Sequence, residues 1–175
     1  MKTKALLLSV LAGVILAGCQ SYFENPNFTV EESGLNWISV RYYNYKTRPI
    51  RKVNVRIDGN GIVDVKEGTS SLVGNPFANK MEELTWGDVR ETRTIIPREE
   101  VVPILQLLVD NGLFKERHNL RGVVSTNESI FVTANIQCHT CGSSNDDIFS
   151  SDPELAEHLK NVVLMYYHPT PRRRK

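Results

Sequence analysis

The feature that most constrains the fold of this chain is an alternation of apolar and polar residues in several short segments. In residues 38–42 and again in residues 53–57, an apolar side chain stands at every second position. Successive side chains of a β-strand point to opposite faces, so this pattern is typical of strands that bury one face only. Such strands need a second layer of structure to cover the buried face.

Turn residues join these segments into hairpins. Asp58-Gly59-Asn60-Gly61 separates residues 53–57 from a second apolar run at 62–65, and glycine adopts the positive φ that tight turns need. A second hairpin is predicted from residues 120–125 and 129–137, joined by residues 126–128. Both hairpins predict neighbouring antiparallel strands.

Two further segments complete the predicted sheet region. Residues 68–87 are polar and contain Asn75-Pro76, which predicts a loop that is long for a compact domain. Residues 89–96 are rich in Thr and Ile and predict another strand, which Pro97 ends.

Two helices are predicted after that strand. Residues 98–111 place acids in the first turn and a stripe of apolar residues along one side, with Gly112 as the C-terminal cap. Ser151-Asp152-Pro153-Glu154 matches a capping box, and apolar residues recur at helical spacing from Leu155 to Tyr166. The predicted class is α+β, a mainly antiparallel β-sheet with two α-helices packed on one face.

Composition limits the number of domains and the class of partner. The chain has 175 residues, of which 41% are apolar, and this amount suits a single core. Its 21 Lys and Arg nearly balance 20 Asp and Glu, whereas nucleic-acid-binding domains usually carry a strong positive charge. We therefore expect one domain and no nucleic-acid partner.

The N-terminus has the features of an export signal. Lys2 and Lys4 precede an apolar run over residues 5–17. A permanent membrane-spanning helix needs roughly 20 apolar residues, so this run is too short to be one. A positive start followed by a short apolar run is typical of a signal peptide.

The end of that run, Leu16-Ala17-Gly18-Cys19, resembles the lipobox of bacterial lipoproteins. The resemblance covers only the signal region and implies that residues 1–18 are removed and that Cys19 carries the lipid. The mature chain is then anchored to a membrane by several acyl chains, each buried methylene contributing about 0.8 kcal/mol. In lipoproteins of two-membrane bacteria, a non-acidic residue such as Gln20 favours the outer membrane, facing the periplasm.

The rest of the chain divides into three parts. Residues 19–34 lack a helical or strand period and predict a lipidated tether, residues 35–168 form the single α+β domain, and residues 169–175 form a basic tail. The tail either keeps the chain in solution or contacts an anionic surface, at about 1 kcal/mol for each basic residue. Its candidate residues are Arg172, Arg173, Arg174 and Lys175.

Cys138 and Cys141 are the clearest candidates for chemistry. Two thiols at this spacing can form a disulfide, exchange electrons or supply half of a zinc site. A redox pair usually precedes a helix directly, whereas the next predicted helix here starts about ten residues later. In an oxidising envelope compartment we expect a structural disulfide, and we expect no metal and no cofactor.

Aromatic residues at the start of the domain are candidates for partner binding. Trp37, Tyr43 and Tyr45 belong to a strand with aromatic side chains on both faces, so some of them point away from the core. Exposed aromatics suit a protein or glycan partner. The alternative is that they pack under the long loop or the tether.

No motif of a hydrolase or of a phosphate-binding loop is present, and we predict no catalytic residues. The expected function is a membrane-anchored envelope lipoprotein that acts as a non-catalytic binding or assembly module. Its partners would be the membrane, through the N-terminal lipid, and another envelope protein or cell-wall component. The alternative is a small metal-binding or thiol redox lipoprotein centred on Cys138 and Cys141.

Overall fold

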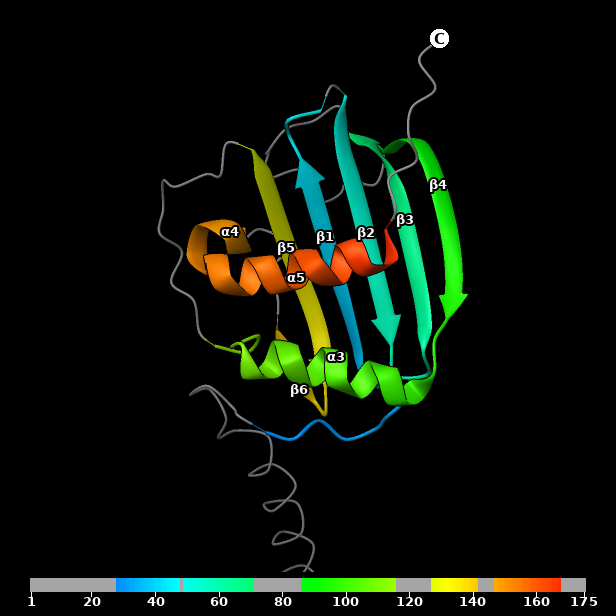
Figure 1. Cartoon of the computed structure of the whole chain (residues 1–175), viewed down its shortest axis with the longest axis vertical. Helices are drawn as coiled ribbons and strands as arrows, with labels where there is room; N and C mark the ends of the chain where they lie inside the picture. Colours follow the sequence, from blue (N-terminus) through cyan, green and yellow to red (C-terminus); the bar gives the residue numbers. More distant parts are fainter. Residues whose placement is uncertain (1–27, 48, 71–85, 116–126, 142–146, 168–175) are drawn as a thin grey trace, which may run out of the picture.

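The described part of the chain forms one sheet with helices on one side of it. The structure is a computed structural model, and it describes residues 28–47, 49–70, 86–115, 127–141 and 147–167. These residues form a six-stranded antiparallel sheet, crossed on one face by two long helices (Figure 1). The predicted α+β class is confirmed.

The first four strands form a meander, and the fifth joins its other side. The spatial order is β4-β3-β2-β1-β5-β6, so the first strand lies between the second and the fifth. Every pair of neighbours is antiparallel. The strands are β1 (Trp37–Asn44), β2 (Ile50–Asp58), β3 (Ile62–Ser70), β4 (Trp86–Ile95), β5 (Glu128–Ile136) and β6 (His139–Cys141).

Strand boundaries differ from the predicted ones at the loops. β3 continues to Ser70 and β4 begins at Trp86, so both ends of the predicted 68–87 loop belong to strands. β6 lies between the predicted strand at 129–137 and the predicted helix start at Ser151, where no strand was predicted. The strand predicted at residues 120–125 falls outside the described residues.

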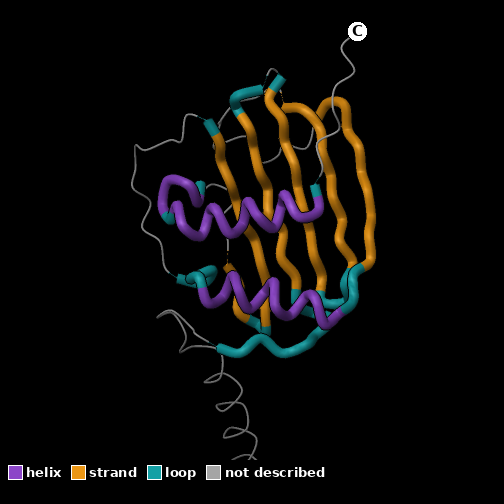
Figure 2. The backbone as a smooth tube through the Cα atoms, in the orientation of Figure 1, coloured by secondary structure: helices purple, strands orange, loops and turns teal. Residues whose placement is uncertain are grey.

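Two long helices cover the core face of the sheet. They are α3 (Arg98–Asp110) and α5 (Pro153–Tyr166), and a short α4 (Ile148–Ser151) leads into α5. The tube in Figure 2 shows α3 and α5 crossing the strands on the same side of the sheet. The N-cap of α5 is Asp152, whose carboxylate accepts a hydrogen bond from the Leu155 N–H, whereas Ser151, the N-cap of the predicted capping box, is the last residue of α4.

The core lies between this helix layer and one face of the sheet. On β1 and β2, every second side chain points into it, which is the alternation that predicted the strands. Val40, Val55, Leu105 and Leu159 are at most 1% exposed. Burial on this scale contributes roughly 1.5–3 kcal/mol for each large apolar side chain, so this layer holds the fold together.

The packed body begins earlier than predicted. Val30 is 3% exposed and belongs to the core, although residues 19–34 were expected to be a tether. The side chain of Gln106 in α3 accepts from the Val30 N–H at 2.7 Å and donates to the Phe28 carbonyl at 3.1 Å. These hydrogen bonds pair backbone groups of a segment that belongs to no strand or helix. Because the segment has no regular periodicity, the sequence pattern does not predict its packing.

Candidate functional site

The two faces of the sheet carry different side chains. The face toward α3 and α5 is apolar, whereas the opposite face, here called the open face, carries aromatic and cationic residues. Residues that stand opposite each other on neighbouring strands point to the same face of the sheet. The strand register therefore shows which residues belong to the open face. On the three strands β1, β2 and β5 they include Trp37, Arg41, Tyr43, Lys52, Arg56 and Phe131.

Arginines lie over aromatic rings in the accessible part of the open face. The guanidinium carbon of Arg56 is 4.7 Å from the centre of the Trp37 ring, and that of Arg41 is 5.9 Å from the centre of the Phe131 ring. Between these pairs, the Ser39 hydroxyl and the Asn54 amide oxygen form a hydrogen bond of 3.0 Å. Each cation is attracted to the negative face of a ring, which restricts its position.

The other end of the open face is buried. Tyr43 and Lys52 are 5% and 2% exposed, and the Lys52 ammonium lies 4.2 Å from the centre of the Trp86 ring. Tyr45 stacks on Tyr43 with 6.1 Å between ring centres, and burial is the main cause of its raised pKa. Of the three aromatic residues predicted to bind a partner, Trp37 and Tyr45 are partly buried, and Tyr43 offers almost no surface.

On the central strands, cationic side chains outnumber acidic side chains on the open face. Their cations are Arg41, Lys52 and Arg56, and the acid opposite Trp37 is Asp58. The carboxylate of Asp58 accepts hydrogen bonds from the N–H groups of Asn60 and Ile62 in the following turn. Asp58 keeps its negative charge in these bonds, and the three cations still outnumber this one acid on β1 and β2.

On β3 and β4, charges pair across the strands. Lys66 pairs with Glu91 at 3.0 Å and Arg93 with Asp64 at 2.6 Å. The hydrogen bond from Arg93 is the main cause of the lowered pKa of Asp64. These pairs align β4 on β3, and Asp64 also stands opposite Arg56 of β2, whose charge contributes to the lowered pKa of this acid.

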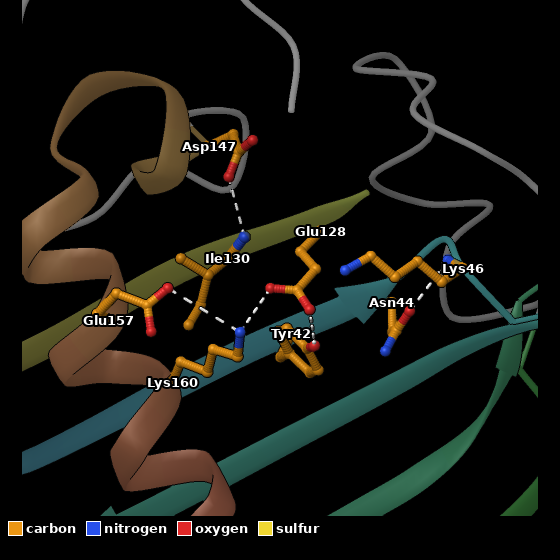
Figure 3. Close-up of polar contacts among 8 residues, drawn as sticks. All are labelled: Tyr42, Asn44, Lys46, Glu128, Ile130, Asp147, Glu157 and Lys160. Carbon is orange, nitrogen blue, oxygen red and sulfur yellow. Dashed lines mark hydrogen bonds and ion pairs between the residues drawn. The ribbon is translucent and has the colours of Figure 1, made fainter. Parts of the chain in front are cut away.

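A partly buried ionisable cluster lies on the other face, beneath α5 (Figure 3). Glu128 accepts hydrogen bonds from Lys160 at 2.7 Å and from Tyr42 at 3.0 Å. Burial disfavours the charged carboxylate, yet the bonds from Lys160 and Tyr42 together outweigh it and lower the pKa of Glu128. Burial, together with the bond to Glu128, raises the pKa of Tyr42. The cluster fastens α5 to β1 and β5, which is a structural role.

Asp147 performs a similar structural task at the edge of β5, as Figure 3 also shows. Its carboxylate accepts from the Ile130 N–H at 2.9 Å and from the Ser129 hydroxyl at 3.1 Å. It also accepts from the Phe149 N–H and so caps α4. The Asp147 carboxylate therefore accepts from backbone N–H groups of both a strand and a helix, and its role is structural.

The predicted disulfide is not formed in the structure. Cys138 is exposed in the turn before β6, and Cys141 is partly buried at the end of that strand. An extended chain rises about 3.3 Å per residue, so the three steps from Cys138 to Cys141 separate the two Cα atoms by on the order of 10 Å. A disulfide tolerates about 7 Å at most, so the bond would require β6 to leave its register.

The remaining predicted sites include parts of the chain that the structure does not describe. Cys19, the signal at residues 1–18 and the tail residues Arg172, Arg173, Arg174 and Lys175 lie outside the described ranges. Within those ranges, no helix combines the length and the apolar character needed to cross a membrane. The same ranges contain no group of three or more His, Cys, Asp and Glu side chains placed to hold a metal ion.

Comparison of the chain with protein-family models found no match, and comparison with curated proteins found no similar sequence. The arrangement of side chains on the open face is therefore the basis for a functional proposal.

Four of the six residues named on the open face were not predicted. Arg41, Lys52, Arg56 and Phe131 were not among the candidate residues, because only the aromatics of one strand were considered. The signal was present in the alternation itself: the positions between the apolar residues of 38–42 and 53–57 include Arg41 and Arg56. Pairing those positions across strands requires the register, which the structure supplies.

Proposed function

We propose that the protein is a lipid-anchored protein of the bacterial cell envelope that binds an acidic polymer through the open face of its sheet. The observation that carries this proposal is the pairing of Arg56 with Trp37 and of Arg41 with Phe131 on the accessible half of that face. The protein acts as a binding module, and the reaction centre of an enzyme is not part of the proposal.

The arginine pairs are suited to anion binding because their positions are already restricted. A guanidinium group that stacks on a ring still has N–H groups at its edge, and these match the two oxygens of a carboxylate. Less side-chain freedom is lost when a ligand binds to a group that is already held in place. The two pairs thus provide prepared sites for carboxylates.

The spacing of the pairs favours an extended partner. In the register of the sheet, Arg41 faces Asn54 and Arg56 faces Ser39, so the two arginines lie diagonally across β1 and β2. Polar side chains fill the surface between them, and Ser39 bonds to Asn54 there. A polymer with repeated negative groups can contact both arginines at once, which raises its affinity over that of a single anion.

Membrane anchoring would keep the module close to its partner. Phe28, the first residue that the structure describes, is nine positions after Cys19. A fully extended chain reaches at most about 3.3–3.6 Å per residue, so Phe28 would stay within roughly 30 Å of a lipidated Cys19. Anchoring therefore concentrates the open face in the layer next to the membrane.

Binding to defined acidic polymers tests the proposal. The purified protein is titrated with polygalacturonate and with polyglutamate, and neutral dextran is the control. We expect binding to the acidic polymers that weakens as salt rises. Replacing Arg41→Gln and Arg56→Gln is expected to reduce affinity by on the order of tenfold each, because each loses a charge-assisted hydrogen bond.

The matched control is Arg98→Gln, which removes an exposed arginine at the start of α3, away from the open face. It is expected to leave affinity unchanged. Equal losses in Arg98→Gln and Arg56→Gln would show that net charge, and not the open face, drives binding. A clear preference for single-stranded DNA over both carboxylate polymers would also contradict the proposal.

The anchor has its own test. Cys19→Ser removes the nucleophile that accepts the lipid, so the variant is expected to be released from membranes when cells are fractionated. Cys138→Ser is the control and is expected to stay in the membrane fraction. Retention of the Cys19→Ser variant in membranes would contradict lipid anchoring.

A further inference from the structure

The outer strand β4 is an unprotected edge over most of its length. It is the last strand on its side of the six-stranded sheet that the structure describes, as Figure 1 shows. Eight of its ten residues are exposed. One edge of such a strand carries backbone N–H and C=O groups that a further strand can pair with.

Only part of β4 is regular. Asp88 has a φ of 49°, and the pairing with β3 shifts between Glu67 and Thr69, which marks a bulge. Residues 90–95 follow the bulge in unbroken register with β3. Val89, next to the bulge, and Ile95, at the far end of this stretch, are 46% and 75% exposed. Residues 90–95 thus form a regular strand that is accessible to a further strand.

We propose that β4 pairs with β4 of a second copy of this chain, antiparallel and centred on Thr92. In such a pair, a twofold axis normal to the sheet relates the copies and keeps each residue on its own face. Facing residues must therefore be an even number of positions apart in the chain. This rule leaves few registers to compare.

The register centred on Thr92 is complementary over residues 90–94. It places Glu91 of each copy opposite Arg93 of the other and Arg90 opposite Thr94. Thr92 faces Thr92, and threonine pairs are favourable in antiparallel sheets. The bulge lies before Arg90, so it does not interrupt this ladder.

The neighbouring registers bring like charges together. Centring on Arg90 places two arginines opposite each other, and centring on Glu91 or on Arg93 likewise opposes two identical charges. Like charges directly opposite one another destabilise a strand pair. The sequence of β4 therefore selects the Thr92 register.

This dimer would extend the function without using the arginine–aromatic pairs of the open face for contact. Since the twofold axis is normal to the sheet, both open faces lie on the same side of the joined sheet. The arginine pairs of the two copies would then face one surface. The dimer is inferred from β4 alone, so a failure of the protein to bind acidic polymers would not contradict it.

Cross-linking of single cysteines tests both the dimer and its register. The full chain with Cys138→Ser and Cys141→Ser is the parent, and Thr92→Cys is added to it. Membranes containing the protein are treated with a short bifunctional maleimide. We expect a species of twice the chain mass for Thr92→Cys, none for the parent, and much less for the matched variant Arg90→Cys.

Complementary charge reversal provides the second measurement. Glu91→Arg and Arg93→Glu each oppose like charges in a homodimer, and each also disturbs a pair with β3. When two differently tagged chains carrying one change each are co-expressed, every facing pair becomes opposite in charge. Co-purification is expected only for that mixture. Cross-linking of Arg90→Cys in place of Thr92→Cys, or a monomer in all these experiments, would overturn the proposal.

Discussion

The same strands carry different kinds of side chain on the two faces of the sheet. Toward α3 and α5, alternate side chains are apolar and form the core, with Val40 and Val55 fully buried. On the open face, the intervening positions carry cations over aromatic rings, such as Arg56 over Trp37. The comparison shows that one strand pattern can encode stability on one side and recognition on the other.

The contrast is less sharp at one end of the molecule. Lys52 belongs to the open face by register but is 2% exposed, and its ammonium lies between the rings of Tyr43 and Trp86. A buried cation needs compensating interactions, and the ring faces supply part of them. Recognition is therefore assigned to the accessible end, around Trp37 and Arg41.

The largest effect is expected from breaking the core face. Leu159 in α5 is fully buried, so Leu159→Ala leaves a cavity and should lower the free energy of unfolding by about 2–5 kcal/mol. Urea unfolding followed by circular dichroism measures the loss. The matched control is Leu164→Ala on the same helix, where the side chain is 43% exposed and the loss should be small. Equal losses would contradict the assigned orientation of α5.

The second effect concerns the ionisable cluster between α5 and the sheet. Glu128→Gln keeps the size of the side chain but removes the charge that Lys160 and Tyr42 bind. Loss of charge-assisted hydrogen bonds should lower the free energy of unfolding by about 1.5–3 kcal/mol near neutral pH. Glu154→Gln, an exposed acid in the first turn of the same helix, serves as the control.

The same cluster predicts a pH dependence. The pKa of Glu128 in the folded chain lies below its ordinary value of 4.5, so its contribution to stability is present above that pH. The contribution is lost as the pH falls through the lowered pKa. Unfolding measured from pH 7 down to acid should thus show the difference between wild type and Glu128→Gln shrinking below pH 4.5. A difference that stays constant across this range would contradict the pairing with Lys160.

Much of the helix-facing side could be predicted from sequence, since it depends on local periodicity. The segment 98–111 carries acids early and a glycine late, and α3 occupies Arg98–Asp110. β1, β2 and β5 follow the same logic of alternating burial. Burial of one face fixes the period of the apolar residues, and the period identifies the element.

The rest depended on contacts between distant segments. The turn before β6 has Gln137 and Cys138 at positive φ, where glycine or asparagine is usual, so the sequence carries no turn signal there. Likewise, Val30 is held by Gln106, which lies 76 residues further along the chain. The open face was only partly predicted, because its pairs join Arg41 on β1 to Phe131 on β5.

A smaller effect is expected on the open face. A double-mutant cycle with Trp37→Leu, Arg56→Gln and the combination measures the coupling between the ring and the guanidinium group. At an accessible site this coupling should be about 0.5–1 kcal/mol in the free energy of unfolding. A cycle between Trp37 and Arg98, which belongs to α3, should give no coupling. Coupling near zero in the first cycle would remove the basis for a prepared arginine.

The smallest change in stability is expected at Cys138 and Cys141. With β6 paired to β5, Cys138→Ser changes an exposed side chain in a turn, and its effect on the melting temperature should be within the error of the measurement. The informative readout is thiol titration without reductant in a chain that also carries Cys19→Ser. Two thiols should react, Cys138 quickly and the partly buried Cys141 slowly. If no thiol reacts before reduction, the predicted disulfide exists. Because the bond and the strand exclude each other, β6 must then be displaced from β5.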